Sequence, residues 1–262
     1  MTTMSGPDLG ESPIWIAIGA EIRKAISSRV ILTTSVLLVV GVGILAGALV
    51  YAAENGNQQV LDQLGPVADL TGWPRLVAVV SQIVAAGGVL GFGVALSWMI
   101  GREFTDRTIS GLFALPVSRS AVVTAKILTY LLWSTAIACL VVLAVGVVGA
   151  ALDVGPIGGA GAAMIRLPIL TVLSAMVAVP AAWASTLGRG PLAGIAVTIG
   201  IVVIAQVMVL SGAGAWFPAA APALWALRPA EVSSIQLALV GLIPLLFGGL
   251  AVVAWHRLQL DR

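Results

Sequence analysis

Charged residues are scarce in this chain, which holds 13 Lys and Arg and 11 Asp and Glu among 262 residues, or 9%. A typical soluble domain has about 25%. Hydrophobic residues make up 60% of the sequence, and a water-soluble fold cannot cover that much apolar surface with a polar exterior. The composition therefore excludes an ordinary soluble domain and indicates a protein that folds in lipid. The net charge of +2 is too small to suggest a nucleic-acid partner.

Residues that carry catalysis or bind metals are also scarce. The single cysteine, Cys139, excludes an intrachain disulfide, and the single histidine is His256. The metalloprotease pattern HExxH, a GxSG nucleophile motif and the phosphate-binding loop GxxxxGK[ST] are all absent. We therefore expect no catalytic site, no metal and no cofactor in this chain, and ATP hydrolysis would have to occur in another subunit.

The few charges mark the ends of six long apolar runs. A helix needs about 20 apolar residues to cross the hydrocarbon core of a bilayer. The sequence therefore predicts an all-α integral membrane protein, with a transmembrane domain over 30–255 between an N-terminal segment 1–29 and a C-terminal segment 256–262. The predicted spans are 30–53, 77–101, 121–151, 167–187, 191–211 and 235–255.

The distribution of basic residues predicts the orientation. Six spans place both termini on one side, and all the basic residues except Arg75, Arg166 and Arg228 fall on that side. Loops rich in Lys and Arg stay in the cytoplasm. We therefore expect both termini to be cytoplasmic. The middles of the spans lack Asp, Glu, Lys and Arg, which argues against a proton- or sodium-coupled transporter.

The segment before the first span has a helical pattern of its own. Isoleucine recurs every fourth residue, at Ile14, Ile18, Ile22 and Ile26, and the charged residues fall largely elsewhere. This pattern predicts an amphipathic helix in the membrane interface. The alternative is a flexible charged segment that leads into the first span.

The segment 101–120, between the second and third spans, is rich in charge. Its apolar residues Ile109, Leu112 and Phe113 have helical spacing, which predicts a short cytoplasmic helix. Glu103, Asp106 and Arg107 would share one face of a helix. One interpretation is a docking surface for a cytoplasmic partner. The other interpretation is a solvated loop without a binding partner, whose basic residues only reflect the enrichment of Lys and Arg in cytoplasmic loops.

This segment resembles the cytoplasmic loop of type-2 permeases of ATP-binding-cassette (ABC) exporters. The residues that match that loop are Glu103, Thr108, Pro116, Ser118, Arg119 and Lys126, whereas Arg107 stands where a glycine is usual. The resemblance implies a coupling helix that docks on an ATPase subunit. The coupling residues would be Arg102, Glu103, Asp106, Arg107, Thr108, Leu112 and Arg119.

The resemblance also implies partners and a location. Two ATPase subunits would hold ATP and Mg, and a second copy of this chain or a homologous permease would complete the membrane part. Short re-entrant helices would lie between spans five and six. The resemblance is closest to bacterial antibiotic and peptide export permeases of the plasma membrane, which implies efflux and antibiotic resistance.

The polar residues inside the predicted spans include Gln82, Ser97 and Gln206. Such groups either form hydrogen bonds between helices or contact substrate. The apolar spans suit a lipophilic or amphipathic substrate, such as a drug, an antibiotic, a peptide or a lipid. The alternative functions are a non-transporting membrane scaffold, a secondary transporter or channel, and an intramembrane enzyme.

Overall fold

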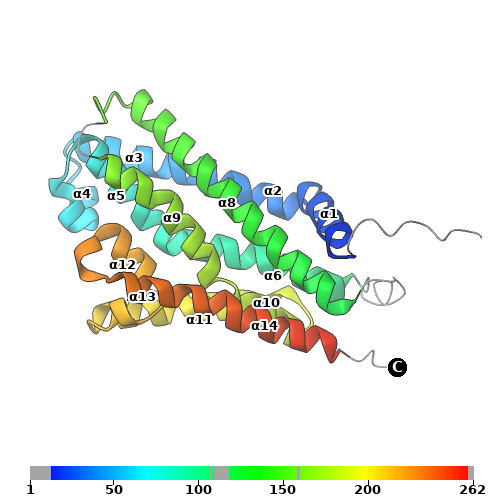
Figure 1. Ribbon diagram of the computed structural model, residues 1–262. Coiled ribbons are helices and arrows are strands. Elements are labelled where there is room, and N and C mark those ends of the chain that lie inside the picture. Colours follow the sequence, from blue (N-terminus) through cyan, green and yellow to red (C-terminus); the bar gives the residue numbers. More distant parts are fainter. Residues whose placement is uncertain (1–12, 107, 109–117, 158–159, 259–262) are drawn as a thin grey trace, which may run out of the picture.

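The computed structural model describes residues 13–106, 108, 118–157 and 160–258 (Figure 1). Within those ranges the chain is helical and has no strand. In this described part of the chain, six helices are long and apolar enough to cross a membrane, which confirms the predicted fold class. They cover Arg29–Glu54, Gly72–Thr105, Arg119–Ala151, Gly161–Leu187, Pro191–Leu210 and Ser234–His256.

Spans one and two each contain a short π-helical stretch that divides them into two α-helices. Span one consists of α2 (Arg29–Val36), the stretch Leu37–Gly41 and α3 (Val42–Glu54). Span two consists of α5 (Gly72–Ile83), the stretch Val84–Gly88 and α6 (Val89–Thr105). Span three is the single helix α8 (Arg119–Ala151), whose first turn is capped by the Ser118 hydroxyl accepting from the amide of Ala121.

Span four is interrupted at a proline. It consists of α9 (Gly161–Val177) and α10 (Pro180–Leu187), because Pro180 has no backbone N–H to continue the helical hydrogen bonds. Span five is α11 (Pro191–Leu210). Span six begins with α13 (Ser234–Ala238) and a 3₁₀ turn, Leu239–Gly241, and continues as α14 (Leu242–His256).

The bundle has two distinct ends (Figure 1). One end, which we call the near end, holds α1 (Pro13–Ile26), the last turn of α6, the first turn of α8 and the last turn of α14. The far end holds two short helices, α4 (Gln58–Leu64) and α12 (Ala221–Leu227). α12 packs against α5 and α9. A short helix between spans five and six is thus present, and its re-entry into the membrane stays a prediction.

α1 is the helix that the isoleucine pattern predicted, and it packs against α8. Its buried face contains Ala17 and Glu21, whereas the isoleucine stripe is half-buried to exposed, with Ile26 at 78% exposure. Ile14, Ile18 and Ile22 are half-buried, and Ile26 is the stripe residue that is exposed. That arrangement is compatible with an interfacial helix, and the interfacial position remains a prediction.

Glycines bring α6 and α11 into close contact in the near-end half of the bundle. A Cβ atom at Gly93 would lie 2.3 Å from Cγ2 of Thr198, and one at Gly101 would lie 2.3 Å from the backbone nitrogen of Pro191. Small residues allow such close approach of helices in membranes. Spans two and five are therefore joined almost backbone to backbone at this contact.

Candidate functional site

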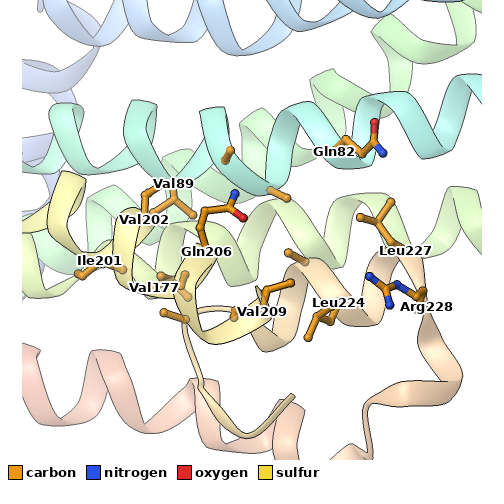
Figure 2. Close-up of a pocket in the computed structure, with 16 residues that line it drawn as sticks. Gln82, Val89, Val177, Ile201, Val202, Gln206, Val209, Leu224, Leu227 and Arg228 are labelled. Atoms are coloured by element: carbon orange, nitrogen blue, oxygen red, sulfur yellow. The ribbon is translucent and has the colours of Figure 1, made fainter. Parts of the chain in front are cut away.

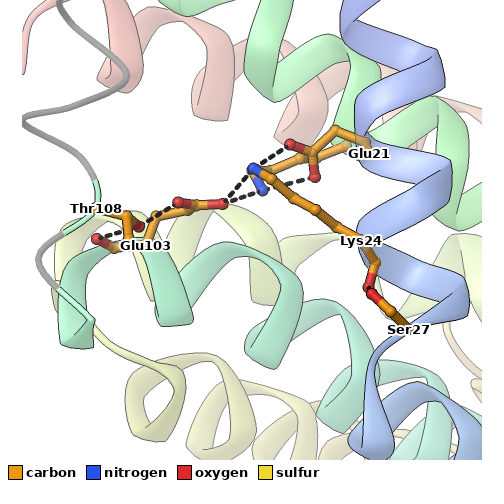
Figure 3. A network of polar contacts seen from close by, with 6 residues as sticks. Glu21, Lys24, Ser27, Glu103 and Thr108 are labelled. Carbon is orange, nitrogen blue, oxygen red and sulfur yellow. Dashed lines mark hydrogen bonds and ion pairs between the residues drawn. The ribbon is translucent and has the colours of Figure 1, made fainter.

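Four charged side chains form a cluster at the near end, which we call the charge cluster: Glu21, Lys24, Glu103 and Lys126 (Figure 3). The Lys126 ammonium lies 2.7 Å from Oε1 of Glu103 and 2.8 Å from Oε2 of Glu21. The Lys24 ammonium lies 2.9 Å from Glu21 and 3.2 Å from Glu103. Each carboxylate thus contacts both ammonium groups.

Three helices contribute to this cluster. Glu21 and Lys24 come from α1, Glu103 from the last turn of α6, and Lys126 from the first part of α8. Glu21 and Lys126 are 105 positions apart in the chain. The cluster therefore ties the N-terminal helix to the two spans that flank the loop 107–117.

Burial makes the pairing obligatory. The exposed fractions are 1% for Lys126, 2% for Glu103 and 5% for Glu21. A buried charge without a partner is strongly destabilising, whereas two carboxylates and two ammonium groups balance each other. Burial alone would lower the pKa of Lys24, but the hydrogen bond and charge of Glu21 and the charge of Glu103 outweigh it and hold the pKa above its ordinary value.

A hydroxyl completes the coordination of Glu103. Oγ1 of Thr108 donates to Oε2 of Glu103 at 2.5 Å, on the side away from the two lysines (Figure 3). Thr108 lies just beyond the end of α6, at the start of the loop. The predicted pair of Glu103 and Thr108 is therefore brought together by a direct contact.

The interpretation of Glu103 and Asp106 as parts of one docking surface is wrong for Glu103, whose side chain is buried. α6 ends at Thr105, Asp106 is exposed, and Glu103 turns inward because Lys24 and Lys126 supply its countercharges. A buried carboxylate cannot contact a partner protein directly. Arg107 and Leu112, which were also predicted as coupling residues, lie outside the described residues.

Two further predicted residues lie near the cluster without belonging to it. Arg102 is half-buried in the last turn of α6, where a cation is favourable at the negative end of the helix dipole. Arg119, in the first turn of α8, donates from Nη1 to the carbonyl of Leu258. Arg119 therefore links the start of α8 to the segment that follows α14.

The sequence patterns alone do not assign Glu21 and Lys24 to this cluster, and they indicate Lys126 only as a residue of the loop motif. The available signal was Glu21 itself, the one acidic residue within Pro13–Ile26. A lone acidic residue in an otherwise apolar and basic helix, together with Glu103 and Lys126 in one motif, is the pattern that could have indicated an internal charge network.

A cavity of about 230 Å³ opens in the far-end half of the bundle, between span two, α11 and α12 (Figure 2). Gln82 from α5 and Gln206 from α11 both line it, and Arg228, which follows α12, lies at one end. The structure thus brings together two of the polar residues that the sequence singled out. The third, Ser97, does not line this cavity.

Ser97 is fully buried at the contact between α6 and α11. Its hydroxyl donates to the carbonyl of Gly93 at 2.6 Å, and a Cβ atom at Gly194 would lie 2.3 Å from its Oγ. Ser97 therefore packs between two helices. Within the described ranges, no three His, Cys, Asp or Glu side chains gather in a way that could hold a metal ion.

Comparison with known protein families gives one match. A family model described as "ABC-2 family transporter protein" matches residues 17–206. The match begins in α1, includes every residue of the charge cluster and the loop 107–117, and ends at Gln206. No curated protein matches the chain.

Proposed function

The chain belongs to the ABC-2 transporter family, and from that premise we propose that it is the permease subunit of an ATP-driven exporter. Members of this family are membrane subunits that associate with ABC ATPase subunits and are not themselves catalytic. In our proposal two ATPase subunits bind ATP and Mg beneath the near end. A second copy of this chain, or a homologous permease, completes the membrane part.

The observation that carries this proposal is the position of the charge cluster. It lies directly at the base of the loop 107–117, with Glu103 shortly before the loop and Lys126 shortly after it. Lys24 and Glu21 fasten α1 to the same point. A displacement of the loop by a partner would therefore move α1, α6 and α8 together instead of bending one helix end.

In this mechanism the loop makes the contact and the cluster transmits the movement. Asp106, with Arg107 and Leu112 in the loop, would face the ATPase. Glu103 would act from inside as a positioning residue, held by Thr108 and by the two lysines. Arg102 and Arg119 would fix the two ends of the loop, Arg119 through its bond to Leu258.

The proposal includes an orientation and a cargo class. The near end would face the cytoplasm of a bacterial inner membrane, because ten of the 13 basic residues lie on that side, all except Arg75, Arg166 and Arg228. The cargo would be lipophilic or amphipathic, as in efflux of a drug, antibiotic, peptide or lipid. Efflux of this kind would give antibiotic resistance if the cargo were an antibiotic.

Purification of the full chain from its native membrane tests this function. We expect a retained subunit that carries the phosphate-binding loop GxxxxGK[ST], and an ATPase rate that differs between the complex and the isolated ATPase subunit. Glu103→Gln should bring the ratio of those rates toward one while the subunit stays bound. Asp106→Asn, at the exposed neighbouring carboxylate, should weaken subunit retention instead.

The opposite results would contradict the proposal. A chain that retains no ATPase subunit under mild extraction would not be an ABC permease subunit in the membrane. If Glu103→Gln released the ATPase while Asp106→Asn left it bound, direct docking through Glu103 would be correct and the transmitting role of the cluster would be wrong.

A further inference from the structure

The far-end cavity adjoins a second cavity of different chemistry. The first, of about 230 Å³, contains Gln82, Gln206 and Arg228. The second, of about 320 Å³, is lined only by apolar residues. The two cavities share the side chains of Val177, Ile201 and Ala219 as a common wall. A polar compartment therefore lies directly beside an apolar one.

The helix contacts explain why the space opens there. In the near-end half, α6 and α11 touch through Gly93 and Gly101, and no space remains between them. Toward the far end the two spans separate, and α12 only partly fills the gap. The π-helical stretch Val84–Gly88 lies on this wall, and Ala85 and Ala86 of that stretch line the cavity. π-Helical turns inside α-helices occur often at functional sites.

The polar compartment contains hydrogen-bonding groups that are not already in use. Among the described residues, neither the Gln82 amide nor the Gln206 amide has a hydrogen-bond partner. Figure 2 shows the Gln206 side chain extending from α11 toward span two, which carries Gln82. Each amide offers both a donor and an acceptor. Because Gln206 is also exposed at the surface of the bundle, the compartment is accessible from the side.

Among the residues that line the polar compartment, Arg228 is charged, and its counterion is a carboxylate outside the compartment. The guanidinium of Arg228 is paired with the carboxylate of Glu231, at 3.2 Å from Nη1 to Oε1. An anionic or cationic head group would have to leave water without a free countercharge, which is costly. A head group with uncharged donors and acceptors would instead satisfy the two amides.

The apolar compartment suits a hydrophobic body. Its walls include the rings of Trp183 and Phe247, whose centroids are 5.9 Å apart, together with Phe217 and two prolines, Pro180 and Pro218. The break in span four at Pro180 thus forms part of this wall. Aromatic and aliphatic walls beside a few polar groups are typical of small-molecule sites.

We propose that the two adjoining cavities form a binding site for an uncharged amphiphile, whose amide or hydroxyl head contacts Gln82 and Gln206 and whose apolar part lies against Trp183 and Phe247. The inference rests on the proposed export function and specifies its cargo site. The amphiphile enters from the membrane, between α11 and α12, in the half of the bundle farthest from the charge cluster.

Photolabelling of the full chain in phosphatidylcholine nanodiscs tests this site. The probes are three amphiphiles that share one diazirine-bearing alkyl chain and differ in the head: N-methylglucamide, phosphate or trimethylammonium. We expect mass spectrometry to find adducts of the glucamide probe on peptides that contain Trp183 or Phe247. Gln206→Leu should lower this labelling about fivefold, the effect of one lost neutral hydrogen bond.

Two alanines of α11 provide a matched pair of variants. Ala205 lines the cavity, whereas Ala196 lies on the exposed face of the same helix. Ala205→Phe should fill the cavity and abolish labelling at Trp183 and Phe247. Ala196→Phe adds the same ring to the same helix and should leave the labelling unchanged. Unfolding temperature and gel-filtration profile establish that both variants are folded.

The results of these experiments distinguish a failure of the binding-site proposal from a failure of the proposed export function. Labelling spread evenly over the lipid-facing spans, or equal for the three head groups, would overturn the site proposal. Equal labelling of the Ala205→Phe and Ala196→Phe variants would also overturn it. None of these results affects ATPase retention, so the permease assignment would stand. Conversely, loss of ATPase association with intact cavity labelling would refute the exporter and leave an amphiphile-binding membrane protein.

Discussion

Neutralising Glu103 should destabilise the protein far more than neutralising an exposed carboxylate. The Glu103 carboxylate accepts from Lys126, Lys24 and Thr108, and it is almost fully buried. Glu103→Gln keeps the shape of the side chain but removes one of the two negative charges. Lys24 and Lys126 then share the single carboxylate of Glu21, and the buried cluster carries a net positive charge.

The magnitude follows from the cost of an uncompensated buried charge. Removing one partner of a buried ion pair costs about 3–5 kcal/mol, which corresponds to roughly 10²–10⁴-fold in the folding equilibrium. Asp62 provides the comparison, because it is exposed at the far end and only accepts from the Gln58 amide at 3.2 Å. Asp62→Asn should change stability by no more than about 0.5 kcal/mol.

Thermal unfolding, followed by the fluorescence of the eight tryptophans, measures this difference. A third variant isolates the ionic interaction. Glu103→Gln combined with Lys126→Met removes one charge of each sign and leaves Lys24 paired with Glu21. The double variant should therefore be more stable than the sum of the two single effects predicts.

Two results would refute this reasoning. One is an unfolding temperature for Glu103→Gln that matches that of Asp62→Asn. The other is strict additivity in the double variant, because it would mean that Glu103 and Lys126 do not interact energetically in the folded protein.

The helix contact and the orientation lead to two more predictions. Gly93→Ala should cost about 1–3 kcal/mol in stability, because its Cβ atom would overlap Thr198, whereas Gly146→Ala has no atom within 4 Å to displace and should unfold near the wild-type temperature. In a Cys139→Ala background, a membrane-impermeant maleimide added to intact cells should label Asp62→Cys and not Ser27→Cys; the reverse pattern would invert the proposed orientation.

The spans could be predicted from the sequence because charges are so rare that each one delimits an apolar run. The predicted boundaries differ from the observed ones at the ends of the helices. Span two was predicted over 77–101 and extends over Gly72–Thr105, and span four was predicted from residue 167 but begins at Gly161. Long basic side chains such as Arg166 can extend toward the interface while their backbone stays helical. A charge therefore marks the edge of the hydrocarbon layer and not the end of the helix.

The site was harder to predict because its contacts join distant parts of the chain. Helical spacing relates residues three or four positions apart, and it grouped Glu103 with Asp106 and Arg107, whereas Glu103 lies in the last turn of span two. Helical spacing carries no information about α1 and α8. It therefore cannot show that Lys24 and Lys126, from those two helices, contact the Glu103 carboxylate. Gln82 and Gln206 were recognised individually as polar residues in spans. Their shared cavity depends on how α5 and α11 separate, which tertiary packing determines.

The charge cluster has a consequence for the conditions in which the protein works. Mobile ions weaken electrostatic attraction only where they can approach the charges, and the side chains of Lys126 and Glu103 are 1% and 3% exposed. The junction of α1, α6 and α8 is therefore insulated from changes in ionic strength. The pair of Arg228 and Glu231, with side-chain exposures of 59% and 50%, has no such protection and weakens in a saline medium.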